Sequence, residues 1–214
     1  MEPCPPKRLA MTPGGDLPGF EHIRRFWDEQ WGATIAKILP GEYYVTTQDE
    51  YIATVLGSCV SACVRDPVFG IGGMNHFMLP LKGEEGSNAE VFSAADRYGN
   101  FAMEHLINTI LKHGGRREGL EVKIFGGGKI LVNMTDIGER NIAFVREYIK
   151  TENLLLLAED VGDVFPRKVI YHPLSGKVKV KKLNSLQDDN VVERERHYLE
   201  DLNRKPVEGE VDLF

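Results

Sequence analysis

The sequence has few cysteines, no long apolar run and no excess of positive charge. Only three cysteines, Cys4, Cys59 and Cys63, occur among 214 residues, and such a small odd number does not build a disulfide framework. No apolar stretch reaches the roughly 18 residues that a membrane-spanning helix needs. The formal net charge of −6 argues against a nucleic-acid-binding protein, which usually presents a basic face. We therefore expect neither membrane insertion nor a nucleic-acid partner.

The N-terminal segment lacks the apolar core of a secretory signal and is rich in proline and glycine instead. We therefore expect a cytoplasmic protein with three parts. Residues 1–35 are predicted to form a flexible leader, with a short helix beginning near residue 20. Residues 36–185 are predicted to form one domain, for which a hydrophobic content of 42% supplies a core. Residues 186–214 are charged and predicted to be a solvated, disordered tail, with a partner-binding segment as the alternative.

The pattern within the domain predicts many strands and two long helices. Runs of β-branched and aromatic residues predict strands, and apolar residues three and four apart predict helices. The predicted strands are 42–47, 51–56, 59–65, 71–79, 120–125, 154–161, 167–172 and 177–183, and the predicted helices are 93–115 and 137–153. Since most of the strands are arranged as hairpins, we expect a layered α+β fold.

A cysteine and a histidine are expected to meet in one of these hairpins. Asp66-Pro67, followed by Gly70, is a turn signal between the strands at 59–65 and 71–79. A turn centred between residues 67 and 68 places Cys59 opposite His76, with their Cβ atoms about 5 Å apart. The glycines beside both residues leave room for a substrate. A buried structural role is the competing interpretation for each residue alone, and it is the better one for Cys63.

This pair predicts acyl-transfer chemistry. An imidazole beside a thiol generates the thiolate nucleophile, and the backbone N–H groups near residues 57–59 are natural donors for an oxyanion. The imidazole would return the proton to the leaving nitrogen, and water would hydrolyse the thioester. A third group usually orients the imidazole. The nearby candidates are Thr54, Ser58, Ser61 and Asn75, and spacing does not choose among them.

Two other motifs predict less. Cys59 and Cys63 have the spacing of a metal-binding pair, but no second pair of ligands with matching spacing is present, so we expect no metal. Residues 126–129, GGGK, resemble a phosphate-binding loop but lack the spacing and the following Ser or Thr of that motif. We expect a tight passage near the active site here instead.

Five motifs, in order, resemble the CheD family of chemoreceptor glutamine deamidases. They are LGSCVSACVRDP (56–67), GGMNHFMLP (72–80), FGGGKI (125–130), IGERN (137–141) and RKVIYHPLSGKVKVKKL (167–183). The resemblance covers about residues 36–183. It implies a layered α/β/α sandwich with mostly antiparallel strands, related to bacterial toxin deamidases. It also implies hydrolysis of particular glutamine side chains in methyl-accepting chemotaxis receptors to glutamate, with release of ammonia and without a cofactor.

The resemblance assigns the nucleophile to Cys59 and the base to His76. The family's third site residue is a threonine six residues before the nucleophile, where this sequence has Ala53, and Thr54 follows one residue later. In a strand that shift predicts that the Thr54 hydroxyl faces the opposite side, unless a bulge restores it. Thr54 is therefore the third candidate, with another orienting group as the alternative.

The expected function is thus a protein-glutamine deamidase that uses Cys59, His76 and Thr54. The alternative is a non-catalytic docking module that binds chemoreceptors or a CheC-type phosphatase, which the family pairs with in some bacteria. A thiol protease of broader specificity would need a cleft for an extended chain. A reactive Cys59 favours the enzyme, and an inert, buried Cys59 favours the module.

Overall fold

The computed structural model describes residues 17–81, 88–130, 137–183 and 189–204, which form two sheets and several helices. The strands are β1 (Arg24–Asp28), β2 (Ala33–Lys37), β3 (Tyr43–Thr46), β4 (Tyr51–Leu56), β5 (Val60–Asp66), β6 (Ile71–Asn75), β7 (Glu121–Gly126), β8 (Leu155–Val161), β9 (Arg167–His172) and β10 (Lys177–Lys182). The helices are α1 (Asn88–Lys112), the short 3-10 helix η1 (Arg117–Gly119), α2 (Ile137–Thr151) and α3 (Asp189–Arg204).

The strands form two five-stranded sheets, with orders β1-β2-β4-β9-β10 and β3-β6-β5-β7-β8. All neighbouring strands pair antiparallel except β2 with β4 and β7 with β8. The buried apolar residues form one main core cluster, which includes Ile52 and Leu56 of β4 and Val60 and Val64 of β5. The predicted α+β class, with mostly antiparallel strands, is therefore confirmed.

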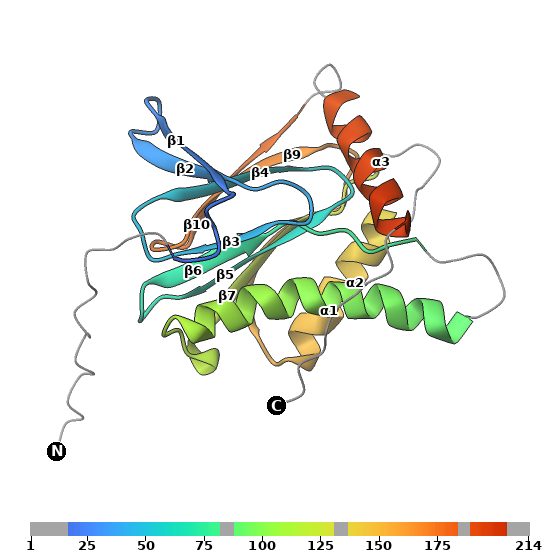
Figure 1. Cartoon of the computed structure of the whole chain (residues 1–214), viewed down its shortest axis with the longest axis horizontal. Coiled ribbons are helices and arrows are strands. Elements are labelled where there is room, and N and C mark those ends of the chain that lie inside the picture. The colour runs from blue at the N-terminus through green and yellow to red at the C-terminus, as the bar shows by residue number, and fades with distance from the viewer. Residues whose placement is uncertain (1–16, 82–87, 131–136, 184–188, 205–214) are drawn as a thin grey trace.

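The layers are sheet, sheet and helices. Figure 1 shows the β4-containing sheet above the β5-containing sheet, with α1 and α2 beneath both. The helices α1 and α2 pack on strands of the β5-containing sheet. The expected α/β/α order has a second layer of helices, but the structure has the β4-containing sheet in that place. In this sheet, β1 and β2 extend β4, β9 and β10 to five strands.

Both ends of the described chain differ from the expectations. The prediction of a short helix near residue 20 is wrong, because residues 24–37 form the β1–β2 hairpin. Strand β2 of this hairpin pairs with β4. The absence of a helical apolar period in this segment agrees with that outcome. The prediction of a tail that is disordered throughout is also wrong, because residues 189–204 form α3. Within the described ranges, no helix is both long and apolar enough to cross a membrane.

The β5–β6 hairpin has a different register from the one expected. Cys63 pairs with Met74, and Val60 forms an isolated bridge with Phe77. Cys59 is therefore not opposite His76, and the predicted pairing is wrong by two residues. A shift of two keeps the same side chains on the same face, so Cys59 and His76 remain diagonal neighbours.

Candidate active site

The loop at residues 57–59, between β4 and β5, is held by the glycine loop that follows β7. The Gly127 N–H donates to the Cys59 carbonyl, and the Gly128 N–H donates to the Gly57 carbonyl, each at 2.7 Å. Gly126 has a positive φ of 107°, and a Cβ on it would lie 2.2 Å from the Cys59 carbonyl oxygen. The GGG motif is therefore the tight passage that its sequence indicates, and it positions the backbone of the loop at 57–59.

Asn141 of α2 fixes the same loop from another side. Its fully buried amide donates to the Ser58 carbonyl at 2.8 Å and accepts from the Leu79 N–H at 2.9 Å. Gly138 lies against the glycine loop, since a Cβ there would be 2.5 Å from the Gly127 carbonyl oxygen. The IGERN motif thus joins α2 to the two loops that carry the candidate nucleophile and base. The sequence pattern alone did not reveal this role.

His76 follows β6 and is 2% exposed. Its backbone N–H donates to the Glu42 carbonyl at 2.9 Å, and its carbonyl accepts from the Gly41 N–H at 2.8 Å. The ring Nδ1 lies 2.8 Å from the Thr54 hydroxyl oxygen. Of the four orienting groups considered from the sequence, Thr54 is the one whose side chain bonds to the imidazole in the described structure.

Thr54 faces His76 without a bulge. The β4–β9 register is regular from Ile52 to Leu56, and Thr54 lies on the inner face of its sheet. Ala53 instead packs in a separate small cluster with Ile35 and Ile170. The expectation that the Thr54 hydroxyl faces away from the site is wrong, because Thr54 rather than Ala53 occupies the inward position of the strand.

The Thr54 hydrogen bonds determine the tautomer of His76. The Thr54 hydroxyl donates its single hydrogen to the Ile38 carbonyl at 2.9 Å. It must therefore accept from His76, so Nδ1 carries the ring proton and Nε2 carries a lone pair. That Nε2 is buried and has no hydrogen-bond partner among the described residues. In this tautomer the acceptor lone pair of the imidazole is therefore on Nε2.

The candidate proton donor is Cys59. Its Sγ and a ring nitrogen of His76 belong to a cluster whose atoms all lie within 4.8 Å of one another. Burial raises the pKa of the Cys59 thiol well above its usual range, and the nearby Glu195 carboxylate raises it further. Burial lowers the pKa of His76 to about 3. In this arrangement the pair is therefore a neutral thiol and a neutral imidazole.

Glu195 of α3 completes the cluster. Its carboxylate accepts from the Gly57 N–H at 2.7 Å, the Ser58 N–H at 2.7 Å and the Cys59 N–H at 3.1 Å. It also accepts from the Ser58 hydroxyl at 2.6 Å. The N–H groups proposed from the sequence as oxyanion donors therefore converge on one anion. Sequence reasoning missed Glu195, although it stands on the apolar stripe of α3.

Cys59, His76 and Glu195 also have the ligand types of a metal site. However, both Glu195 oxygens already accept hydrogen bonds from the loop at residues 57–59. Backbone N–H dipoles directed at one point favour an anion there and oppose a cation. The donor set therefore fits an oxyanion better than a metal ion.

The remaining polar candidates have other contacts. The Ser61 hydroxyl donates to the Asn75 carbonyl, and the Asn75 side chain accepts from the Ala62 N–H at 2.8 Å. These contacts replace regular pairing where β5 and β6 diverge. Cys63 is buried in the core, and burial raises its thiol pKa. The core role expected for Cys63 agrees with this environment.

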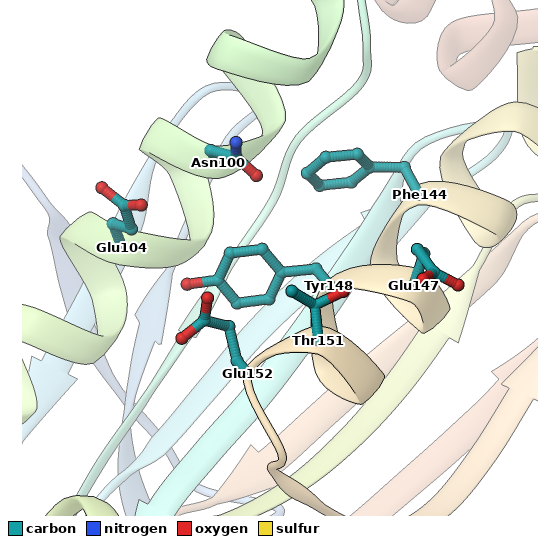
Figure 2. A pocket seen from close by; sticks show the side chains of 7 residues that line it. All are labelled: Asn100, Glu104, Phe144, Glu147, Tyr148, Thr151 and Glu152. Carbon is teal, nitrogen blue, oxygen red and sulfur yellow. The ribbon is translucent and has the colours of Figure 1, made fainter.

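A pocket between α1 and α2 lies apart from these residues. Figure 2 shows its lining, which is Asn100, Glu104, Phe144, Glu147, Tyr148, Thr151 and Glu152. It includes three carboxylates but no cysteine or histidine. The candidate nucleophile and base both lie in the cluster at Cys59, so that cluster is the candidate active site.

Comparisons with known proteins identify similar chains. A family model described as CheD chemotactic sensory transduction matches residues 78–182, a range that begins after Cys59 and His76. The probable chemoreceptor glutamine deamidase CheD of Hahella chejuensis is 53% identical over 208 residues, which cover 97% of this chain and 98% of that protein. The protein of the same name from Halorhodospira halophila is 55% identical over 200 residues, or 92% and 93% of the two chains.

A solved structure of a Neisseria meningitidis protein of the DUF152 family is also similar. It has a TM-score of 0.39 and 12% identity, over 63% of this chain and 66% of that chain. A likeness this weak carries no conclusion about function.

Proposed function

Because this chain belongs to the CheD family, we propose that it hydrolyses glutamine side chains of chemoreceptors to glutamate and releases ammonia. Relatives that match nearly the whole chain support the family and its reaction. The choice of glutamine depends on those relatives, since the site geometry alone is suited to several acyl groups.

The proposed reaction begins at Cys59. His76 Nε2 accepts the thiol proton, and Sγ attacks the amide carbon of the substrate. The N–H groups of residues 57–59 stabilise the oxyanion. His76 then gives the proton to the leaving nitrogen, the C–N bond of the tetrahedral intermediate breaks, and ammonia departs, which leaves a thioester on Cys59. His76 next activates a water molecule, which hydrolyses the thioester, restores the thiol and leaves a glutamate.

The observation that carries this mechanism is the tautomer of His76. Thr54 holds the proton on Nδ1, so the lone pair on Nε2 is available within the cluster that contains Cys59 Sγ. A histidine with only a structural role would ordinarily have both ring nitrogens satisfied when buried. We therefore assign Thr54 as a positioning residue, which acts through His76.

We place the reaction in the cytoplasm and name a CheC-type phosphatase as a second partner. Cys59 and Cys63 are both free thiols in the described structure, which suits a reducing compartment. The phosphatase depends on the family resemblance alone, and co-purification with such a protein would test it.

One observation favours the alternative function. Cys59 is completely buried, and its thiol pKa is raised, as expected of an unreactive cysteine in a docking module. The contacts of Glu195 account for part of that burial. The two hypotheses, a deamidase and a docking module, therefore differ in whether Cys59 turns over a substrate.

The test is ammonia release and amide-to-acid mass change on a purified receptor cytoplasmic fragment. Wild type, Cys59→Ser and His76→Ala are compared, with Cys63→Ala as the matched control for loss of a buried thiol. We expect activity in wild type and Cys63→Ala and a loss of about 1,000-fold or more in the other two variants, because each removes a member of a catalytic unit. Binding without turnover by wild type would establish the docking module. Full activity in Cys59→Ser would overturn the mechanism.

A further inference from the structure

The face that α3 turns toward the body of the protein is apolar except at one position. Buried or half-buried residues recur along that face at helical spacing, and they are Val191, Val192, Glu195, Tyr198, Leu199 and Leu202. Glu195 is in the middle of this stripe and only 1% exposed. A carboxylate at the centre of a packed helix face costs free energy unless its environment is built to receive it.

That environment is the loop at residues 57–59. Four donors reach the Glu195 carboxylate, three of them backbone N–H groups and one the Ser58 hydroxyl. Gly57 allows this close approach, since a Cβ on it would lie 2.7 Å from a Glu195 oxygen. Hydrogen bonds to a charged group stabilise more than those to a neutral one, so these four offset the cost of burying the carboxylate.

Other contacts seat α3 along the site. The Tyr198 hydroxyl is hydrogen-bonded to the hydroxyl of Tyr98 on α1, and Gly41 leaves space for the Tyr198 ring. Near the C-terminal end of α3, Asn203 accepts from the Leu81 N–H at 3.1 Å. Figure 1 shows α3, in red, at the end of the sheets opposite the β1–β2 hairpin tip. The helix therefore has a defined orientation over Cys59.

The group that Glu195 brings to the site is chemically the product of the proposed reaction. A deamidated glutamine is a glutamate side chain, and its carboxylate leaves from the donors that held the oxyanion. Glu195 occupies those donors, and its carboxylate oxygen lies within 4.8 Å of Cys59 Sγ. No acyl group can reach the same N–H groups while Glu195 is there.

We propose that α3 is a built-in mimic of the product, and that the surface beneath it is where a helix carrying the substrate glutamine docks. This inference depends on the proposed function, whose substrate class it specifies as a glutamine on the apolar stripe of a helix. The two helices occupy the surface in turn, so α3 inhibits the enzyme until a substrate helix displaces it.

The first test removes the carboxylate of Glu195. Glu195→Ala in the full chain is compared with wild type and with Glu193→Ala, which removes an exposed carboxylate from the same helix. Two rates are measured, ammonia release from the receptor fragment below saturation and alkylation of Cys59 by iodoacetamide. We expect Glu195→Ala to raise both rates about tenfold or more, because the open site becomes more populated, and Glu193→Ala to leave both unchanged. Unchanged rates, or slower deamidation, in Glu195→Ala would overturn the proposal.

The second test converts the product mimic into a substrate. In Glu195→Gln, Sγ attacks the carbon of the introduced side-chain amide, ammonia leaves with the proton from His76, and water hydrolyses the thioester to a carboxylate. The net reaction is amide plus water to carboxylate plus ammonium. We expect the amide of this variant to become a carboxylate on storage, at a rate independent of protein concentration. Glu195→Gln combined with Cys59→Ser should retain the amide, as peptide mass spectrometry would detect.

The outcomes separate this proposal from the proposed function. An active wild type, together with an amide that persists in Glu195→Gln, refutes the product mimic and leaves the deamidase intact. Conversion of that amide without activity on the receptor fragment supports the mimic and the chemistry, and removes the chemoreceptor as substrate. A persistent amide together with an inactive wild type refutes both.

Discussion

At the scale of single residues, one hydroxyl group determines the state of the site. Thr54 has one hydrogen and gives it to the Ile38 carbonyl, so it can only accept from His76. This is an orienting contact to a neutral group, whereas a carboxylate in the same place would also stabilise the imidazolium electrostatically. The site therefore relies on geometry more than on a third charge.

Replacing Thr54 by valine tests that reliance. The shape is kept while both hydrogen bonds are lost, so the ring is free to take the other tautomer. We expect Thr54→Val to lower kcat about 10- to 100-fold, with KM nearly unchanged. Losses of this size are typical when the group that orients a functional histidine is removed. Thr54→Ser, which keeps the hydroxyl, should retain most of the activity. Initial rates on the receptor fragment measure this, and an equal loss in both variants would mean that packing rather than hydrogen bonding matters.

The buried imidazole predicts a pH dependence of stability. Burial lowers the pKa of His76 from 6.5 to about 3, and the unfolded chain carries an ordinary imidazole. Between these values the unfolded state binds a proton that the folded state does not. His76 therefore contributes stability that is complete above pH 6.5 and is lost as the pH falls toward 3.

Urea unfolding at pH 6.5 and pH 5 would measure that contribution. We expect the free energy of unfolding of wild type to fall more steeply on acidification than that of His76→Gln, by up to about 1.4 kcal/mol per pH unit. The glutamine side chain does not titrate, so it serves as the reference. Parallel curves for the two proteins would contradict a buried, neutral His76.

At the scale of elements, the site is held by loops that brace one another. The glycine loop after β7 supports the backbone of residues 57–59, and Asn141 of α2 joins Ser58 to Leu79. These contacts come from segments far apart in the sequence. A change in the glycine loop should therefore affect the position of Cys59 without a change at Cys59 itself.

Gly126→Ala is the direct test of that bracing. Gly126 has a left-handed backbone, and a Cβ would lie 2.2 Å from the Cys59 carbonyl oxygen, so strain and overlap add. We expect a loss of about 3 kcal/mol or more in unfolding free energy and a strong loss of activity. Gly162→Ala, with a similarly positive φ but open space around it, should cost only about 1 kcal/mol. Equal losses would show that backbone conformation, not contact with Cys59, sets the cost.

The elements also show which parts of the site the sequence could predict. Short-range signals were sufficient for β4, β9 and the start of α2, whose residue patterns are local. The β5–β6 register was predicted two residues away from its actual value, because the hairpin turns later than Asp66-Pro67 implied. Because the error was an even number of residues, Cys59 and His76 still lie on the same face of the hairpin.

At the scale of the whole molecule, the features that the sequence did not predict depend on contacts between segments far apart in the chain. Nothing local to Glu195 indicates that it will contact residues 57–59, which precede it by more than 130 positions. The apolar stripe of α3 is visible in the sequence. However, a helix of this length gains most of its stability from packing, so the segment was interpreted as solvated while the surface that it packs on was unknown. The β1–β2 hairpin was missed for the same reason, because its pairing with β4 decides its form.

The attachment of α3 to the same chain sets the terms on which any substrate competes. Only residues 184–188 separate Leu183, just past β10, from α3 in the sequence. A group tethered this closely has an effective concentration in the range of about millimolar for a short linker. A free helix of equal intrinsic affinity would have to reach a comparable local density to occupy half of the sites. Such an enzyme would have little activity on dilute substrate and would be active where substrate helices are present at high local concentration.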